Sequence, residues 1–299
     1  MIEAKEFSKK FEDYMAVDSL NMTFEKGHIY GLVGTNGSGK STFLRSICGV
    51  YKPYCGQIEI DGNGVYDSVE AKQRVFFVND ESYFLPNVSV DDMAQFYKGF
   101  YPNWSQTKYE KLTQRFPIDS KKKIKTFSKG MKRQAAIILA LSCQTEYLLL
   151  DEAFDGLDPV IRVAARKLIA DEVAERDIGV VIASHNLREL EDFCDTVAIL
   201  HKGRLVTQQN VEEISKNFCK VQAAFKPPID IARIVGEKLL SVKQNGSIVN
   251  IIAACGQKEM EDIINPLSPV LSEYIPLTLE EVFIYEMEAV GYDYNNIIF

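Results

Sequence analysis

Residues 34–41 read Gly-Thr-Asn-Gly-Ser-Gly-Lys-Ser, which fits the phosphate-loop pattern of glycine, four residues, glycine, lysine, and serine or threonine. The apolar run at 28–33 comes directly before this octapeptide and indicates a buried strand. Residues 42–47 follow it and indicate the start of a helix. Because the motif functions between a strand and a helix, this context supports a nucleotide-binding site here.

The glycines Gly34, Gly37 and Gly39 allow the backbone to approach a triphosphate closely, with its N–H groups directed inward. The helix that follows adds the positive end of its dipole. Lys40 would hold the β- and γ-phosphates, and Ser41 would bind Mg²⁺. The predicted nucleotide-binding residues of this segment are Gly34, Thr35, Asn36, Gly37, Ser38, Gly39, Lys40, Ser41 and Thr42.

The composition describes a chain with a substantial core and an acidic balance. It has 299 residues, of which 46% are hydrophobic, and a net charge of −8. This length suffices for one large domain or two modest ones. The negative charge argues against a nucleic-acid-binding surface over the whole chain. The basic run at 121–125 is better explained as a solvated loop, so we expect no nucleic-acid partner.

The spacing of the cysteines and the hydropathy of the sequence indicate the cellular compartment in which the protein works. The six cysteines form no close C-x-x-C pair, which argues against a zinc site and a disulfide framework. No signal peptide is visible at the beginning of the sequence. The longest apolar run, near 135–143, is shorter than the about 20 residues that cross a bilayer. We therefore expect a soluble, cytoplasmic protein that needs a separate partner for any role at a membrane.

The order of elements predicts an α/β fold with a parallel sheet. Alternating segments in residues 1–26 predict antiparallel strands. Continuous apolar runs predict strands covered on both faces; these runs lie at 74–78, 147–152 and 179–184. Helices are expected in an insertion at about 87–144 and at 160–176, and a hairpin at 197–207 turns across Lys202-Gly203.

The character of the chain changes beyond about residue 218. Strands are expected at 220–225, 239–244, 247–253 and 270–276, and helices at 229–236 and 258–265. This β-α-β-β-α-β order is ferredoxin-like, and Asn245-Gly246 is a strong hairpin signal. A last helix begins at Thr278. We predict two domains, 1–217 for nucleotide binding and 218–299 as an accessory or dimerisation domain.

A second motif indicates the reaction. Asp151 and Glu152 end the buried strand at 147–152. Asp151 can reach the Mg²⁺ shell, and Glu152 is placed to polarise a water molecule against the γ-phosphate. His185 ends the next buried strand, beside the expected nucleotide edge, and we interpret it as a γ-phosphate contact. These residues predict triphosphate hydrolysis, with Glu152 and His185 as the catalytic pair.

With these motifs in place, the chain resembles the nucleotide-binding subunit of an ATP-binding-cassette (ABC) transporter over roughly residues 1–215. Phe127-Ser128-Lys129-Gly130-Met131 stands where that family has its Leu-Ser-Gly-Gly-Gln signature, and it keeps Ser128 and Gly130. The resemblance implies a phosphate-loop ATPase core with an antiparallel β subdomain and a helical insertion. It also implies that Ser128 and Gly130 cap the γ-phosphate of ATP on the opposite subunit, since a capped helix N-terminus binds anions.

The same resemblance assigns three further positions. Asp158 belongs to the loop that touches the partner subunit, and His185 is the switch histidine. Phe11 is implied to stack on adenine, with Tyr14 as the alternative. Either ring could equally belong to the core.

The chain departs from the family where a glutamine usually follows the second apolar strand. Asp80 stands there, or Asn79 if the alignment slips by one residue. An aspartate could still contact a metal-bound water, so Asp80 joins Ser41 and Asp151 as a predicted Mg²⁺ residue. Its extra negative charge bears on coupling to a membrane partner rather than on nucleotide binding.

One chain carries one phosphate loop and one signature, so the resemblance implies a head-to-tail dimer that encloses two ATP molecules. The second ATPase subunit is either another copy or a paralogue. A separate transmembrane permease subunit would hold the dimer at the inner face of the cell membrane. The tail segment Pro-Leu-Thr-Leu-Glu-Glu-Val-Phe at 276–283 resembles exporter-type members, which implies export of a drug, peptide, lipid or polysaccharide.

Two other functions fit parts of the sequence. A soluble ABC protein acting on ribosomes or DNA would usually carry two cassettes or a long coiled coil, and this chain has neither signal. A nucleotide-dependent regulator with little turnover is allowed by Asp80 and Lys129. The intact Asp151, Glu152 and His185 argue against that second reading.

Overall fold

The computed structural model describes residues 1–81, 83–226, 229–275 and 277–289. The chain divides into two compact units. The first comprises Met1–Asn186 and Ala198–Leu205, and the second comprises Leu187–Val197 and Val206–Phe299. The predicted domain boundary at 217/218 remains a proposal.

An antiparallel sheet opens the first unit, as the alternating segments predict. Its strand order is β2-β1-β4-β5. The strands are β1 (Ile2–Phe11), β2 (Tyr14–Phe24), β4 (Cys55–Ile60) and β5 (Asn63–Gly64). Its inward side chains include Ile2, Phe7 and Phe24, which are fully buried. One face of the sheet thus supplies part of the core.

The central sheet has the order β10-β9-β3-β8-β7-β6. Its strands are β3 (Ile29–Val33), β6 (Val75–Val78), β7 (Tyr147–Asp151), β8 (Gly179–Ser184), β9 (Thr196–His201) and β10 (Arg204–Asn210). Strands β3, β8, β7 and β6 are parallel neighbours, and every residue of β3, β7 and β8 is buried. The predicted parallel sheet is confirmed.

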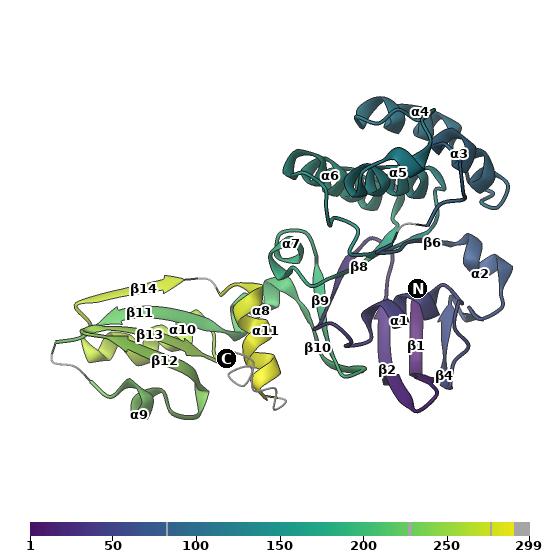
Figure 1. The fold of residues 1–299 in the computed structure, drawn as a ribbon. Helices are drawn as coiled ribbons and strands as arrows, with labels where there is room; N and C mark the ends of the chain where they lie inside the picture. Colours follow the sequence, from purple (N-terminus) through teal and green to yellow (C-terminus); the bar gives the residue numbers. More distant parts are fainter. Residues whose placement is uncertain (82, 227–228, 276, 290–299) are drawn as a thin grey trace. The chain divides into compact units, whose positions relative to one another are not determined.

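Helix α1 (Lys40–Ile47) lies between the two sheets, and helices α3 to α6 lie on the other side of the parallel strands (Figure 1). Phe43 of α1 is fully buried, with its ring 6.0 Å from Phe7 and 6.1 Å from Phe24 between centroids. Burying such a side chain stabilises the fold by about 1.5–3 kcal/mol. This packing fixes the helix that begins at the phosphate loop.

The predicted helical insertion is present as three helices joined by loops. They are α3 (Val90–Lys98), α4 (Gln106–Arg115) and α5 (Lys129–Ser142), with the 3-10 turn η1 (Ile124–Thr126) before α5. Ser89 and Asp92 form a reciprocal capping box at the start of α3. The predicted helix α6 (Pro159–Arg176) follows β7, and the short helix α2 (Val69–Gln73) was not predicted.

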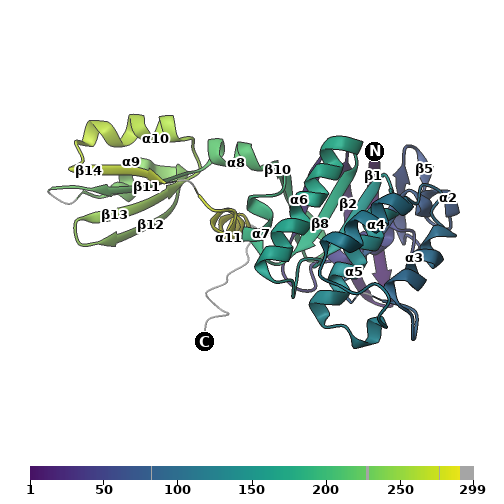
Figure 2. The same cartoon turned by 90° about the horizontal axis from the view of Figure 1, so that it is seen from above.

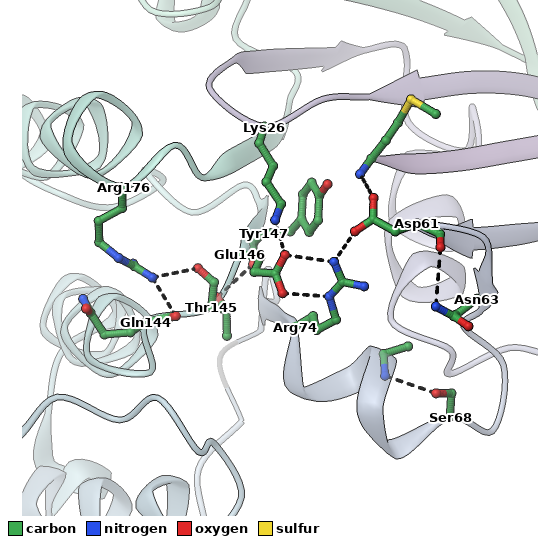
Figure 3. A network of polar contacts seen from close by, with 12 residues as sticks. Lys26, Asp61, Asn63, Ser68, Arg74, Gln144, Thr145, Glu146, Tyr147 and Arg176 are labelled. Carbon is green, nitrogen blue, oxygen red and sulfur yellow. Dashed lines mark hydrogen bonds and ion pairs between the residues drawn. The ribbon is translucent and has the colours of Figure 1, made fainter.

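A polar network fixes the amino ends of the parallel strands (Figure 3). Glu146, directly before β7, accepts hydrogen bonds from Arg74 Nε at 2.8 Å and from Lys26. The Arg74 guanidinium holds the pKa of Glu146 below its usual range. Arg176, at the end of α6, donates to the backbone carbonyls of Gln144 and Thr145. These hydrogen bonds hold together the amino ends of the parallel strands. The phosphate loop and the Asp151–Glu152 pair lie at the opposite, carboxyl ends.

The second unit contains an antiparallel sheet of order β12-β13-β11-β14. Its elements are β11 (Cys219–Ala224), α9 (Ile231–Val235), η2 (Gly236–Lys238), β12 (Leu239–Asn245), β13 (Ile248–Ala253), α10 (Gln257–Ile264), η3 (Asn265–Leu267) and β14 (Leu271–Ile275). Figure 2 shows α10 along one side of this sheet. The elements follow one another in the predicted β-α-β-β-α-β order. Pro276, the predicted end of the last strand, lies outside the described residues.

The described residues of the second unit also form the helices α7 (Leu187–Glu191), α8 (Val211–Asn217) and α11 (Leu279–Ala289). Helix α11 is the predicted final helix, whereas α7 and α8 were not predicted. Among the described residues, no helix combines the length and the apolar character that crossing a membrane requires.

Candidate nucleotide site

The phosphate loop joins β3 to α1 with a backbone that glycine alone adopts easily. Gly37 has φ +80° and Gly39 has φ +106°. A Cβ on Gly34 would lie 2.4 Å from the Leu200 carbonyl oxygen, and one on Gly39 would lie 2.5 Å from that of Ala16. The loop is thus packed from behind, which leaves its inner side for a ligand.

Lys40 is buried inside this loop. Its ammonium donates hydrogen bonds to the carbonyl oxygens of Gly34 at 2.5 Å and Thr35 at 3.2 Å. Burial lowers the pKa of Lys40, and the nearby carboxylates of Glu152 and Asp151 oppose that shift. The side chain is therefore held at the loop, where the predicted phosphate contact requires it.

A cavity of about 270 Å³ lies over the loop. It brings residues 36–42, which include Ser41 and Thr42, together with Asp80 and Glu152. Gly34 and Thr35 do not line this cavity and instead anchor Lys40 from below. Of the predicted loop residues, those at 36–42 therefore line the cavity, and Gly34 and Thr35 hold the Lys40 side chain in place.

Tyr14, not Phe11, lines this cavity. The Tyr14 hydroxyl donates to the Gly37 carbonyl at 3.1 Å. The Phe11 ring instead packs edge-on against Tyr51, at 5.1 Å between centroids, and the Lys9 ammonium lies 4.8 Å from its centre. The geometry therefore favours the alternative aromatic for a nucleotide contact.

Asp151 has the environment of a cation ligand. It is 1% exposed, and neither carboxylate oxygen has a hydrogen-bond partner among the described residues within ordinary distance and angle. Burial raises the pKa of Asp151, and the neighbouring Ser41 hydroxyl opposes that shift. A buried carboxylate without donors is costly unless a positive charge approaches it. Asp151 and Ser41 thus fit a hard cation such as Mg²⁺, which prefers oxygen ligands.

Glu152 and His185 meet at the carboxyl ends of β7 and β8. Glu152 Oε2 lies 2.9 Å from His185 Nδ1, and its Oε1 accepts from the His185 backbone N–H at 3.1 Å. Glu152 has φ +49°, a left-handed conformation that costs a non-glycine residue about 1 kcal/mol. Asp155 lies close enough for one ligand atom of each to fall within 4.8 Å of the others.

Two arginines that sequence reasoning missed support Asp80. Arg45 lies 3.6 Å from the Asp80 carboxylate and donates to the Asn79 side chain at 3.1 Å. The buried Arg133 guanidinium donates to the backbone carbonyls of Asn79 and Asp80. The sequence contains a signal for Arg45, which lies four residues after Ser41 on α1. Because residues i and i+4 share a helix face, Arg45 could have been predicted to lie near the site. No local signal marks Arg133.

The signature segment forms the exposed start of α5. Ser128 caps this helix by accepting from the Met131 N–H at 3.2 Å. A Cβ on Gly130 would lie 2.6 Å from the Gly156 carbonyl oxygen, so glycine permits close packing there. Asp158 similarly caps α6, and neither it nor Ser128 lines the cavity over the phosphate loop. Lys129 of the signature instead lines a neighbouring cavity of about 530 Å³, which it shares with Asp80 and Glu152.

We predict that His185 titrates above 6.5, because its pKa is raised, first by the hydrogen bond to Glu152 and further by the nearby carboxylates. The ion pair is then present below pH 6.5 and is lost as the pH rises through the raised pKa. Carbon-13 histidine NMR can follow this, since the chain has three histidines. The substitution Glu152→Gln should return the pKa of His185 toward 6.5, because it removes the carboxylate that raises it.

His201 is the internal control, because burial lowers its pKa and Glu152 is not among the causes. Its titration should be the same in both proteins. A His185 signal that titrates at or below 6.5 in the unmutated chain would contradict the observed pair.

Comparison with known proteins agrees with this site. Residues 17–155 match the model of a family described as ABC transporter. The ABC transporter ATP-binding protein YtrB of Bacillus subtilis (strain 168) is 30% identical over 284 residues, covering 95% of this chain and 97% of YtrB. The bacitracin transport ATP-binding protein BcrA of Bacillus licheniformis is 31% identical over 219 residues, 72% of either chain.

A solved structure, described as the ATP-binding subunit of an ABC transporter, matches the fold with a TM-score of 0.67. It is 25% identical and covers 72% of this chain and 91% of its own. The phosphate loop, the carboxylates behind it and the near full-length likeness to YtrB lead to one conclusion. The chain belongs to the ABC transporter family, as an ATP-binding subunit.

Proposed function

We propose that this chain hydrolyses ATP with Mg²⁺ and thereby powers export of a drug, peptide or lipid through a separate membrane subunit. The observation that carries the proposal is the convergence of Lys40, Asp151 and the Glu152–His185 pair at one edge of the parallel sheet. BcrA, named for bacitracin transport, supports a role in transport. A regulator without turnover has no need of this complete arrangement.

Ser41 and Asp151 would hold Mg²⁺, with Asp80 acting through a water molecule. The ion supplies charge neutralisation on the phosphates when it is bound. Lys40 binds the terminal phosphates, and Glu152 orients the attacking water molecule. His185 contacts the γ-phosphate from the end of the neighbouring strand.

The exposed signature supports a sandwich dimer. Ser128 and Lys129 are exposed at the start of α5, and neither lines the chain's own nucleotide cavity. Such a helix N-terminus attracts an anion. A second ATPase subunit, identical or paralogous, would present its bound ATP there, with Asp158 at the same interface.

A surface beside Asp80 suits the membrane partner. A cavity of about 190 Å³ includes Asn79 in its lining and is otherwise lined largely by aromatic side chains, among them Phe76, Phe77, Tyr83, Phe84 and Tyr97. Tyr83 is 75% exposed. Exposed aromatic residues of this kind are typical of protein interfaces. The subunit would therefore act at the inner face of the cell membrane, bound to its permease.

Glu152→Gln should reduce the ATP hydrolysis rate by about 10²-fold or more, because it removes the group that orients the water molecule. ATP should still bind, so the variant should accumulate as a dimer in ATP and Mg²⁺ on a sizing column. Lys40→Ala is the matched control and should remain monomeric. Continued turnover by Glu152→Gln together with a monomer would contradict the mechanism.

Tyr14→Ala should raise the KM for ATP about tenfold, since stacking an aromatic ring on a base contributes about 1–3 kcal/mol. Phe11→Ala should change KM less than about twofold, because that ring packs on Tyr51. Steady-state ATPase kinetics on both variants compare the two rings directly. The reverse order would assign the adenine contact to Phe11, as the family resemblance implies.

The membrane half of the proposal is tested by affinity purification of the chain from its native cells in mild detergent. A polytopic membrane protein should co-purify at comparable stoichiometry and be identified by mass spectrometry. Replacing the exposed Tyr83 with Asp should weaken that association without lowering the basal ATPase rate. Recovery of ribosomal proteins, or of no partner from intact membranes, would sink the transporter assignment.

A further inference from the structure

The two faces of the sheet in the second unit differ in what covers them. Val221 and Ile251 are fully buried and pack in one cluster with Met260 of α10, on the side of the sheet where Figure 2 shows that helix. Because successive side chains of a strand alternate between faces, Lys220 and Asn250 point to the other face. The core of this unit therefore uses one face of the sheet, and the second face has side chains of a different character.

A cavity of about 500 Å³ lies on this second face. Its lining residues come from β11, β12, β13 and α11, which all belong to the second unit. Lys243 of β12 pairs with Asn250 of β13, and paired residues of neighbouring strands share a face. The cavity is thus bounded by the sheet on one side and by α11 on another. Its volume is typical of a site for a small molecule.

The tail segment builds the helical wall of this cavity. Its Leu-Glu-Glu-Val-Phe stretch lies in α11, and Glu281 is the second glutamate of that stretch. Glu281 Oε1 accepts from the Lys220 ammonium at 2.6 Å, and Oε2 accepts from the Thr278 N–H at 3.1 Å. Burial opposes the ionisation of Glu281, but these hydrogen bonds outweigh it and hold its pKa below the usual range. The motif therefore anchors α11 beside the sheet, where Ile284 and Tyr285 line the cavity.

The cavity has an excess of positive charge. Two ammonium groups, of Lys220 and Lys243, and one carboxylate, of Glu281, line it, which gives a net charge of +1. The chain as a whole has a net charge of −8. Both oxygens of Glu281 already accept hydrogen bonds, while Lys220 uses one of its three donors on that carboxylate. The lining thus attracts an anion and has donors for it.

The same cavity has apolar surface beside the lysines. Leu240, Ile252 and Ile284 line it together with the Tyr285 ring. Leu240 is 37% exposed, so part of this apolar surface is in contact with water. An inorganic anion would leave that surface uncovered, whereas each CH₂ group buried against it favours binding. The lining therefore matches a ligand that has both a charged and an apolar part.

We infer that this cavity binds a small organic anion with an apolar body, such as a medium-chain carboxylate. The anionic head pairs with the ammonium groups of Lys220 and Lys243, and the chain packs on the apolar side chains of the lining. A ligand in this position contacts both α11 and β12. Because every lining residue belongs to the second unit, the inference is independent of ATP hydrolysis.

Isothermal titration calorimetry of the full-length protein with decanoate tests the inference, at concentrations below those at which decanoate forms micelles. One equivalent should bind with a Kd below about 1 mM. Acetate has the same head without the chain, and decyltrimethylammonium has the same chain with the opposite charge. Each of these two compounds should bind at least about tenfold more weakly than decanoate, since each lacks one of the two matched parts.

Three variants locate the binding. Lys243→Gln removes a positive charge from the cavity and should raise the Kd for decanoate about fivefold, the upper end for a partly exposed ion pair. Lys258→Gln is the matched control, because it removes the same charge from an exposed position on α10, and it should leave the Kd within about 1.5-fold. Ser241→Trp fills the cavity and should abolish binding. Thermal melting checks that each variant is folded.

Three results would overturn the inference. The first is equal affinity for decanoate and decyltrimethylammonium, and the second is an equal Kd in Lys243→Gln and Lys258→Gln. The third is an unmutated chain that does not bind decanoate. If that chain also self-associates in sedimentation velocity and Ser241→Trp prevents it, the face is a contact between copies rather than a ligand site.

Discussion

The parallel register of β3, β8 and β7 is the constraint on which the rest of the site depends. Val33 pairs with Ser184, and Asp151 pairs with Ala183, so these strands end at one level. The phosphate loop, the carboxylates and His185 each lie at or directly after one of those ends. Because one residue advances a strand by about 3.3 Å and reverses its side-chain direction, a slip in register would separate Glu152 from His185.

Local signals predicted most of this arrangement, and tertiary contacts account for what they missed. Continuous apolar runs identified β3, β7 and β8, and the glycine spacing identified the loop. Helices α2 and α7 span five residues each, which is too short for a periodic pattern to show. The choice between Phe11 and Tyr14 depended on Tyr51, which packs against one ring and not the other. Sequence spacing carries no information about that contact.

The departures from the family pattern are matched by opposite charges nearby. Asp80 lies 3.6 Å from Arg45, and Lys129 lies 3.9 Å from Asp155. These pairs are exposed or partly exposed, so each contributes little to stability. Their effect is instead on the electrostatic potential beside the nucleotide cavity, where each added charge is partly cancelled. Asp80 and Lys129 are therefore weaker arguments against ATP hydrolysis than the sequence alone indicates.

The site is built from groups that each cost the fold free energy. Asp151 is a buried carboxylate with no well-formed hydrogen bond among the described residues, Glu152 has a left-handed backbone, and Lys40 is a buried ammonium. The packing of Phe43 and the polar network around Glu146 hold the strands and α1 in place despite these costs. A phosphate-bound cation would supply the charge that Asp151 lacks, and phosphate oxygens would supply acceptors for Lys40. A bound nucleotide with its cation would thus offset the burial of Asp151 and of Lys40, while the backbone strain at Glu152 would remain a cost to the fold.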